Sequence, residues 1–194
     1  MIDRIIAELI DNMVGANIIS KEAKDAYIYA YTIVIERILT LITIGIAGIV
    51  LHRFVYIVVF ICTFMMLRRR TGGFHLETFG QCFIGTNLIC FIIEISDFIW
   101  SKYMLIVSFI CIVSVIYIVC IGTINHPNLA MNNTELKHSR KRARIVVVLE
   151  TLLLMVIYIA GADRMITGYM VMGINVCALL LFMSRIQSRM NGGK

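Results

Sequence analysis

Proline and charged residues are scarce in this chain, which has one proline in 194 residues and only 15% Asp, Glu, Lys and Arg. Soluble domains carry about 25% charged residues, and linkers between domains are commonly rich in proline, glycine and polar residues. The low charge therefore excludes an ordinary soluble protein. Because no linker-like stretch is present, we expect residues 1–194 to form a single integral membrane domain.

The chain also lacks the residue patterns that hold a metal ion. It has four histidines and six cysteines, but neither a His-Glu-x-x-His sequence nor a Cys-x-x-Cys pair. We therefore expect no metal ion and no cofactor. Its net charge of +6 is not accompanied by a nucleic-acid-binding motif, so we expect no nucleic acid among its partners.

Apolar sequence is abundant: 60% of the residues are hydrophobic, and the mean hydropathy is +0.89. A helix needs about 20 residues to cross a bilayer, so the long apolar runs predict an all-α, polytopic membrane helix bundle with about six transmembrane or re-entrant helices. The expected spans are 27–51, 54–70, 79–98, 103–123, 145–162 and 165–184. The apolar core of the second, Phe54 to Leu67, is short, so six spans and four spans with re-entrant segments both remain open.

Residues 1–24 are expected to contain an amphipathic helix that precedes the spans. Apolar residues recur there at the spacing of one helical face: Ile2, Ile5, Ile6, Leu9, Ile10, Met13 and Val14. The acidic residues Asp3, Glu8 and Asp11 are not typical of a cleaved signal peptide. This helix would lie at the membrane interface or pack on the bundle, and its sequence favours neither arrangement.

The distribution of Lys and Arg predicts the orientation in the membrane. With both termini inside, the cytoplasmic side would carry Arg4, Lys21, Lys24, Arg68 to Arg70, Lys137, Arg140 to Arg142, Arg144, Arg185, Arg189 and Lys194. Only Arg53, Lys102 and Arg164 would lie outside. Because Lys and Arg concentrate in cytoplasmic loops, we expect an even number of crossings, with cytoplasmic loops at 68–82 and 124–144.

Ionisable residues also lie inside the expected spans, among them Glu36, Arg37, Glu94 and Asp97. A charge at the bilayer centre costs about 2.5–3.5 kcal/mol on insertion scales, so each of these side chains needs a partner or a polar cavity. We expect Arg37 and Asp97 to form pairs within the bundle. Glu36 and Glu94 would do the same or would line a substrate cavity.

The segment 68–82 contains the candidate catalytic pair, His75 and Cys82, in the sequence RRRTGGFHLETFGQC. A cysteine peptidase needs a thiolate and an imidazole that takes up the thiol proton and later protonates the leaving amine. The cytoplasm is reducing, so Cys82 should remain a free thiol. The other cysteines lie in apolar runs, where cysteine is an ordinary packing residue: Cys62, Cys90, Cys111, Cys120 and Cys177.

The spacing of this pair demands a bend in the chain. Seven residues along a straight helix would separate His75 and Cys82 by about 10 Å, too far for a hydrogen bond. We expect Gly72, Gly73 and Gly80 to allow the bend. Cys82 would then lie at the start of the third span, where the helix dipole and the imidazolium stabilise a thiolate.

The pattern Arg-Arg-x-Gly-Gly-Phe-His followed by Cys, in a chain of this length and hydropathy, resembles the signature of the accessory gene regulator B (AgrB) family. These are membrane peptidases of Gram-positive peptide signalling. His126-Pro127-Asn128 and the later basic run Arg140 to Arg144 are also similar to family members. The likeness covers nearly the whole chain, including the amphipathic N-terminus.

The resemblance implies a cysteine endopeptidase at the cytoplasmic face of the cell membrane, active in quorum sensing. Cys82 would be the nucleophile and His75 the general base and acid. The substrate would be a short AgrD-like precursor peptide, cut before its acidic C-terminal tail through an acyl-enzyme thioester. A cysteine or serine of the peptide would then capture the acyl group, giving a thiolactone or lactone autoinducing peptide.

Several further roles follow for residues near the pair. Glu77 is the first candidate to orient His75, with Thr78, Gln81 and Asn87 as alternatives. These side chains, or equally the backbone amides near Cys82, would polarise the oxyanion. Gly73 would form the turn of the site. Arg68, Arg69 and Arg70 would bind the acidic tail of the precursor or would only anchor the chain at the membrane surface. A homodimer is compatible with the chain, because symmetric pairs are the commonest oligomers.

Two other functions remain open. A small membrane transporter or peptide-export subunit would use Glu36, Arg37, Glu94 and Asp97 to line a path. Such proteins often contain internal repeats, and none is evident in the sequence. A peptidase that hydrolyses its substrate without closing a ring is the third possibility.

Overall fold

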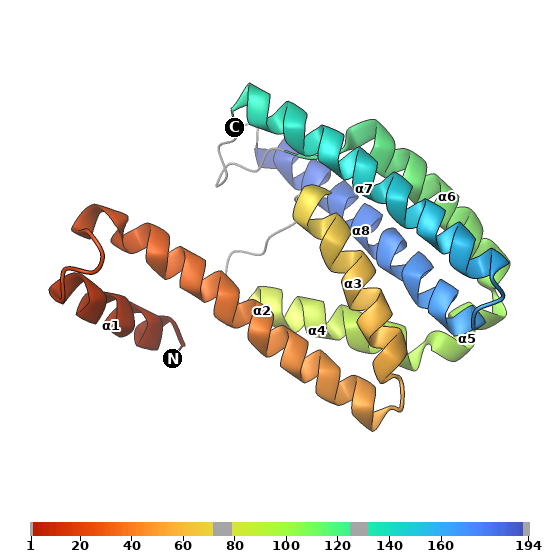
Figure 1. The fold of residues 1–194 in the computed structure, drawn as a ribbon, viewed down its shortest axis with the longest axis horizontal. Helices are drawn as coiled ribbons and strands as arrows, with labels where there is room; N and C mark the ends of the chain where they lie inside the picture. Colours follow the sequence, from red (N-terminus) through yellow and green to blue (C-terminus); the bar gives the residue numbers. More distant parts are fainter. Residues whose placement is uncertain (1, 72–78, 125–131, 192–194) are drawn as a thin grey trace.

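The computed structural model describes residues 2–71, 79–124 and 132–191, and in these residues it is helical without strands. The elements are α1 (Ile2–Gly15), the 3-10 turn η1 (Lys21–Ala23), α2 (Lys24–Val50), α3 (Phe54–Thr71), α4 (Phe79–Ile95), α5 (Asp97–Lys102), α6 (Met104–Ile121), α7 (Asn133–Ile159) and α8 (Arg164–Asn191) (Figure 1). The prediction of an all-α membrane helix bundle is confirmed.

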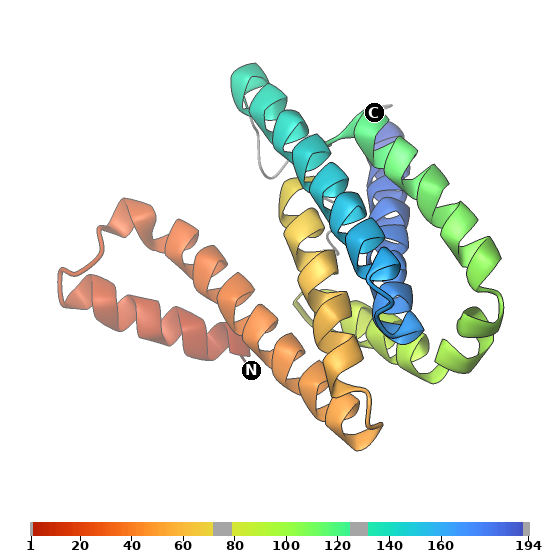
Figure 2. The ribbon, with the colours of Figure 1, turned by 45° about the vertical axis from the view of Figure 1, so that its right-hand side comes forward.

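Helix α8 is the centre of the main bundle, because α3, α6 and α7 all pack against it (Figures 1 and 2). Its residues Ile174, Cys177 and Leu181 are almost completely buried. Gly173 lets α3 approach closely, since a Cβ at that position would lie 3.2 Å from the Cβ of Thr63. Small residues of this kind favour close helix packing in membranes, where apolar lipid removes the hydrophobic drive for helix association.

Helices α1, α2 and α4 lie beside this bundle. Helix α2 contacts α1, α3 and α4, and in Figure 1 it lies alongside α4. Ile6 and Ile10 of α1 are buried against α2, and Asp11 pairs with Lys24 at the start of α2. The amphipathic N-terminal helix is thus present and packs on α2, although Ile5 and Leu9 remain exposed.

Two helix boundaries differ from those expected. The predicted span 79–98 is interrupted at Ser96, where α4 ends and α5 begins. The Nε1 of Trp100 donates to the carbonyl of Ile93 at 3.1 Å, and Asp97 pairs with Arg53, which together stabilise the interruption.

The second difference concerns the predicted basic loop 124–144. Residues 133–144 form the first turns of α7 instead of a loop. A capping box explains this early start, because the Asn132 side chain accepts a hydrogen bond from the backbone of the first turn and Glu135 accepts one from the Asn132 N–H. The basic residues Arg140 and Arg144 are therefore held on a regular helix.

Three segments of the described helices are long and apolar enough to cross a membrane: Lys21–Val50, Met104–Ile121 and Arg164–Ser188. Helix α4 has a shorter apolar stretch, Phe83–Ile95. Helix α3 ends in three arginines, and α7 carries its basic residues in its first half. This chain is a membrane protein whose remaining helices combine apolar stretches with charged ends.

Candidate active site

Cys82 is the fourth residue of α4, so its backbone belongs to the first turn of the helix. The predicted position at a helix N-terminus is therefore confirmed. The first backbone N–H groups of a helix have no partner within it and carry the positive end of its dipole. His75, Gly73 and Glu77 lie outside the described residues, as do the rest of residues 72–78.

Gly80 does not provide the bend that was expected of it. It is the second residue of α4 and has a helical backbone, and the glycines with positive φ among the described residues are Gly122 and Gly161. Helix α3 continues to Thr71 and α4 begins at Phe79, and the two other glycines expected to allow the bend, Gly72 and Gly73, lie outside the described residues.

Arg68, Arg69 and Arg70 form part of the last turn of α3. Arg69 and Arg70 are exposed and Arg68 is half-buried. Cations at a helix C-terminus interact favourably with its dipole, so the basic run also stabilises this end of α3. The three arginines precede the segment that contains His75.

The end of α3 is held by residues that the sequence did not single out. The backbone carbonyl of Arg70 accepts hydrogen bonds from the hydroxyls of Thr123, at 2.7 Å, and Ser139, at 3.2 Å. Thr123 is 1% exposed. Because Thr123 follows α6 and Ser139 belongs to α7, these bonds join the C-terminal end of α3 to both of those helices.

Two arginines of α7 extend this contact. The Nε of Arg140 donates to the carbonyl of Thr123 at 3.3 Å, and the Nε of Arg144 donates to the carbonyl of Val119 at 2.8 Å. Both carbonyls lie at or just beyond the C-terminal end of α6, where backbone acceptors lack helical partners. Gly122 has a φ of +71°, and a Cβ there would lie 3.1 Å from Arg140, so this junction requires glycine. The basic run thus has a structural role at the end of α6.

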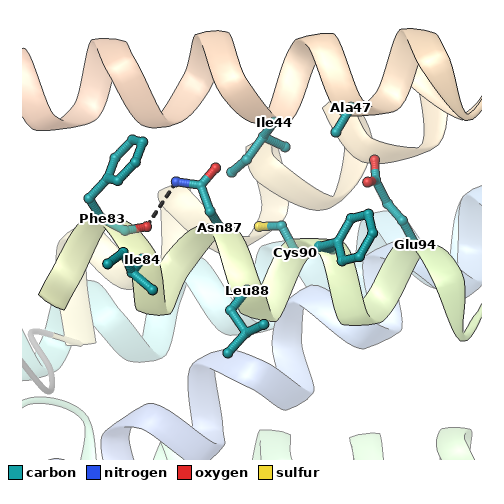
Figure 3. Close-up of a pocket in the computed structure, with 9 residues that line it drawn as sticks. Ile44, Ala47, Phe83, Ile84, Asn87, Leu88, Cys90 and Glu94 are labelled. Atoms are coloured by element: carbon teal, nitrogen blue, oxygen red, sulfur yellow. Dashed lines mark hydrogen bonds between the residues drawn. The ribbon is translucent and has the colours of Figure 1, made fainter. Parts of the chain in front are cut away.

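A pocket of about 350 Å³ lies between α2 and α4 (Figure 3). It is lined by Ile44, Ala47, Phe83, Ile84, Asn87, Leu88, Cys90, Phe91 and Glu94. Its first residue on α4, Phe83, directly follows Cys82. The pocket therefore extends along α4 from Phe83 to Glu94.

Asn87 connects the two walls of this pocket. Its amide nitrogen donates to the carbonyl of Phe83 at 2.8 Å (Figure 3), and its amide oxygen accepts from the hydroxyl of Thr43 on α2 at 2.6 Å. These bonds commit the side chain to holding α4 against α2. Asn87 is accordingly a poor candidate for orienting His75.

Glu94 lies at the other end of the pocket, with its side chain directed toward α2 (Figure 3). It is 3% exposed, and neither carboxylate oxygen has a hydrogen-bond partner in the described part of the chain. The neighbouring Asp97 is paired with Arg53 at 2.9 Å, which confirms the ion pair expected for Asp97. Glu94 is therefore a buried acceptor that lacks a donor.

The two charged residues of the first expected span do not line this pocket. Glu36 is half-buried and Arg37 is exposed on α2. Among residues 2–71, 79–124 and 132–191, Arg37 forms no ion pair. Of Glu36 and Glu94, Glu94 lines a pocket, and a role of that pocket in binding substrate stays a prediction.

A further buried carboxylate, Glu150 on α7, was not considered from the sequence. It is 5% exposed, with both oxygens unpartnered among the described residues. An acidic residue within the apolar run 145–162 was the signal available for it.

Nearby in the core, the Thr71 hydroxyl and the Cys177 thiol lie 3.5 Å apart. The described residues contain no group of three side chains able to hold a metal ion.

These features define a helical membrane protein with a cysteine at the start of one apolar helix and a basic helix end shortly before it. The family model of accessory gene regulator B matches residues 2–186, and the chain belongs to that family. Neither the curated proteins nor the solved structures contain a match to the chain. Membership associates it with accessory gene regulator systems of quorum sensing, and it implies an AgrD-like precursor peptide and the membrane as partners.

Proposed function

We propose that this protein is a cysteine endopeptidase that cleaves an AgrD-like precursor peptide before its acidic C-terminal tail. The observation that carries the proposal is the position of Cys82 in the first turn of α4, within a chain that matches the family over residues 2–186. A helix N-terminus stabilises a thiolate and offers unpaired N–H groups to a developing oxyanion.

The proposed reaction begins when His75 takes the thiol proton and the sulfur of Cys82 attacks the scissile carbonyl. Backbone N–H groups of the first turn of α4 stabilise the tetrahedral oxyanion. His75 then donates its proton to the departing amine, the C–N bond breaks, and the peptide remains as a thioester on Cys82. Glu77 orients the imidazole, and Gly73 forms the turn that brings His75 toward Cys82.

Release of the product requires a second nucleophile. We propose that a thiol or hydroxyl of the bound peptide attacks the thioester, which closes a thiolactone or lactone ring and returns the Cys82 thiol. Attack by water would instead give a linear peptide. Closure of the ring therefore depends on keeping water away from the thioester.

We propose that the site lies at the cytoplasmic face of the cell membrane in a Gram-positive bacterium. The basic ends of α3 and α8 and the basic start of α7 lie toward one end of the bundle (Figure 2), and Lys and Arg favour the cytoplasmic side. Exposed Arg69 and Arg70, with Arg68 beside them, are suited to bind the acidic tail of the precursor through charge-assisted hydrogen bonds.

A transporter or peptide-export subunit is less well supported. Of the four residues that would line its path, Glu94 borders the pocket between α2 and α4, whereas Asp97 is paired with Arg53 and Arg37 is exposed. The described residues thus provide no continuous charged path. Homodimer formation remains compatible with either function.

The proposal is tested by co-expressing the protein with its precursor peptide and measuring the products by mass spectrometry. Processing should be lost in Cys82→Ala and in His75→Ala. Cys62→Ala is the matched control, because Cys62 lies on the exposed surface of α3, away from the pocket between α2 and α4. Processing that persists in Cys82→Ala would refute the mechanism, and a linear product in the wild type would refute ring closure.

A further inference from the structure

A second pocket, of about 500 Å³, lies at the basic end of the main bundle, and the proposed reaction does not use it. The end of α6, the first half of α7 and the last two turns of α8 line it, and these segments lie toward the same end of the bundle (Figure 2). We propose that this pocket binds the phosphate headgroup of an anionic phospholipid, one acyl chain of which lies along α6. The inference does not depend on the peptidase reaction.

The charge of the pocket favours an anion. Arg140 and Arg144 of α7 and Arg185 of α8 line it, and no Asp or Glu does. None of the three arginines forms an ion pair in the described part of the chain. Helices α6 and α8 contain no acidic residue. On α7, Glu135 belongs to the capping box and Glu150 does not line the pocket. The positive charge is therefore left for a ligand to neutralise.

Two of the arginines are already positioned to bind a phosphate. The Nε of Arg140 donates to the carbonyl of Thr123, and the Nε of Arg144 donates to the carbonyl of Val119. A guanidinium has five N–H donors in one plane, and each of these bonds uses only one of them. The bonds therefore orient the guanidinium groups, and their terminal N–H donors can bind phosphate oxygens in pairs. The Ser188 hydroxyl lines the same pocket and adds another donor.

Apolar surface beside the pocket favours a lipid as the source of the phosphate. Cys120 lines the pocket, and the residues that precede it on the same face of α6 are Ile116, Val113 and Phe109, each more than half exposed. An anionic phospholipid matches both features, because its phosphate binds the arginines while an acyl chain covers this stripe. Basic pockets between membrane helices bind anionic headgroups in this way. Inorganic phosphate or a soluble acidic peptide would match the arginines alone.

Native mass spectrometry of the full-length protein in detergent tests the headgroup. Phosphatidylglycerol should bind more tightly than phosphatidylcholine with the same acyl chains. Arg185→Gln should weaken the binding of phosphatidylglycerol by about fivefold, and it leaves in place the two arginines that bind the α6 carbonyls. Arg142→Gln is the matched control, because Arg142 is also exposed but does not line the pocket. Equal binding of the two lipids, or equal weakening by the two variants, would overturn the proposal.

Competition distinguishes the possible sources of the anion. Inorganic phosphate, or a synthetic peptide rich in Asp and Glu, is added to the complex with phosphatidylglycerol. Displacement of the lipid should require a large molar excess of either competitor. Displacement at equal concentration would show a site for a free anion or for an acidic peptide, and would overturn the assignment to a lipid.

A photoreactive lipid locates the acyl chain in the unmodified protein, so this measurement does not depend on the folding of a variant. Phosphatidylglycerol with a diazirine in one acyl chain is added at one molecule per protein and irradiated. Crosslinks should concentrate in residues 109–120 of α6. Val34, Ile38 and Ile42 of α2 are the internal comparison, because each is 51% exposed. Crosslinking of α2 to the same extent as α6 would contradict a specific lipid site.

Discussion

The hydroxyl of Thr123 donates a 2.7 Å hydrogen bond to the backbone carbonyl of Arg70, although 53 residues separate them in the chain. Thr123 in turn accepts at its own carbonyl from the Nε of Arg140. The C-terminal end of α3 is therefore attached to α6 and α7. Because the segment containing His75 begins directly after α3, this contact determines where that segment starts.

Removing both hydroxyls that bind the Arg70 carbonyl should destabilise the protein. Thr123→Val combined with Ser139→Ala leaves that carbonyl without these two donors, and a hydrogen bond typically contributes about 0.5–1.5 kcal/mol to stability. We expect a lower Tm in detergent and reduced peptide processing. Thr151→Val is the control, since its hydroxyl bonds within its own helix to Val147. An equal loss of Tm in the control would contradict a special role for the contact between helices.

The Arg53 and Asp97 pair should show strong coupling. Asp97 is 5% exposed, so Arg53→Leu would leave a buried carboxylate unpaired, at a cost of up to about 3 kcal/mol. Arg53→Leu with Asp97→Leu should recover most of this loss, because no buried charge remains. Unfolding in mixed micelles is measured for wild type, Arg53→Leu, Asp97→Leu and the double variant. If the decrease in the free energy of unfolding of the double variant equals the sum of the decreases in the two single variants, the pair is not coupled.

Helix packing at Gly173 should not tolerate a larger side chain. A Cβ at this position would lie 3.3 Å from the carbonyl oxygen of Phe60 and 3.2 Å from Thr63, so Gly173→Val must separate α3 from α8. We expect a loss of about 1–3 kcal/mol, measured as a lower Tm. Gly45→Ala is the control, because nothing lies within 4 Å of its added Cβ, and it should keep or raise the Tm. A Gly173→Val protein with unchanged Tm would contradict the close contact.

Stability should depend on pH through Asp163. The pKa of Asp163 is lowered, first by the hydrogen bond from the Tyr56 hydroxyl and then by that from the Met165 backbone N–H. A carboxylate with a lowered pKa stabilises the fold above its unfolded pKa, and this contribution is lost as pH falls through its folded pKa. Tyr56→Phe should therefore lower the Tm at pH 7, and the difference from wild type should shrink below about pH 4.

The pH dependence of the Tm difference distinguishes the loss of this hydrogen bond from a loss of packing. The ring of Tyr56 stacks on Tyr169 with centroids 5.6 Å apart, and phenylalanine preserves that stacking. A Tm difference that stays constant from pH 7 to pH 3 would show that ionisation of Asp163 is not involved. Wild type and Tyr56→Phe are compared by thermal unfolding across this range.

The amino-acid sequence by itself determined the helical membrane class, the approximate limits of most helices and the position of Cys82 at a helix start. Apolar runs and the 3.6-residue period are local properties, so they can be recognised without knowing which helices meet. The same holds for the amphipathic helix α1, whose apolar face is visible in residues 2–14. The early start of α7 was not predicted, because the basic run was interpreted as a loop and the capping box of Asn132 and Glu135 was not recognised.

Only the tertiary structure decided which distant residues meet. Nothing in the order of residues indicates that Thr123 binds the carbonyl of Arg70, or that Asp97 selects Arg53 as its partner. The pocket between α2 and α4 likewise exists because Ile44 and Glu94, 50 residues apart, lie across from each other when the helices pack. Such contacts depend on the directions of whole helices, which local periodicity does not specify.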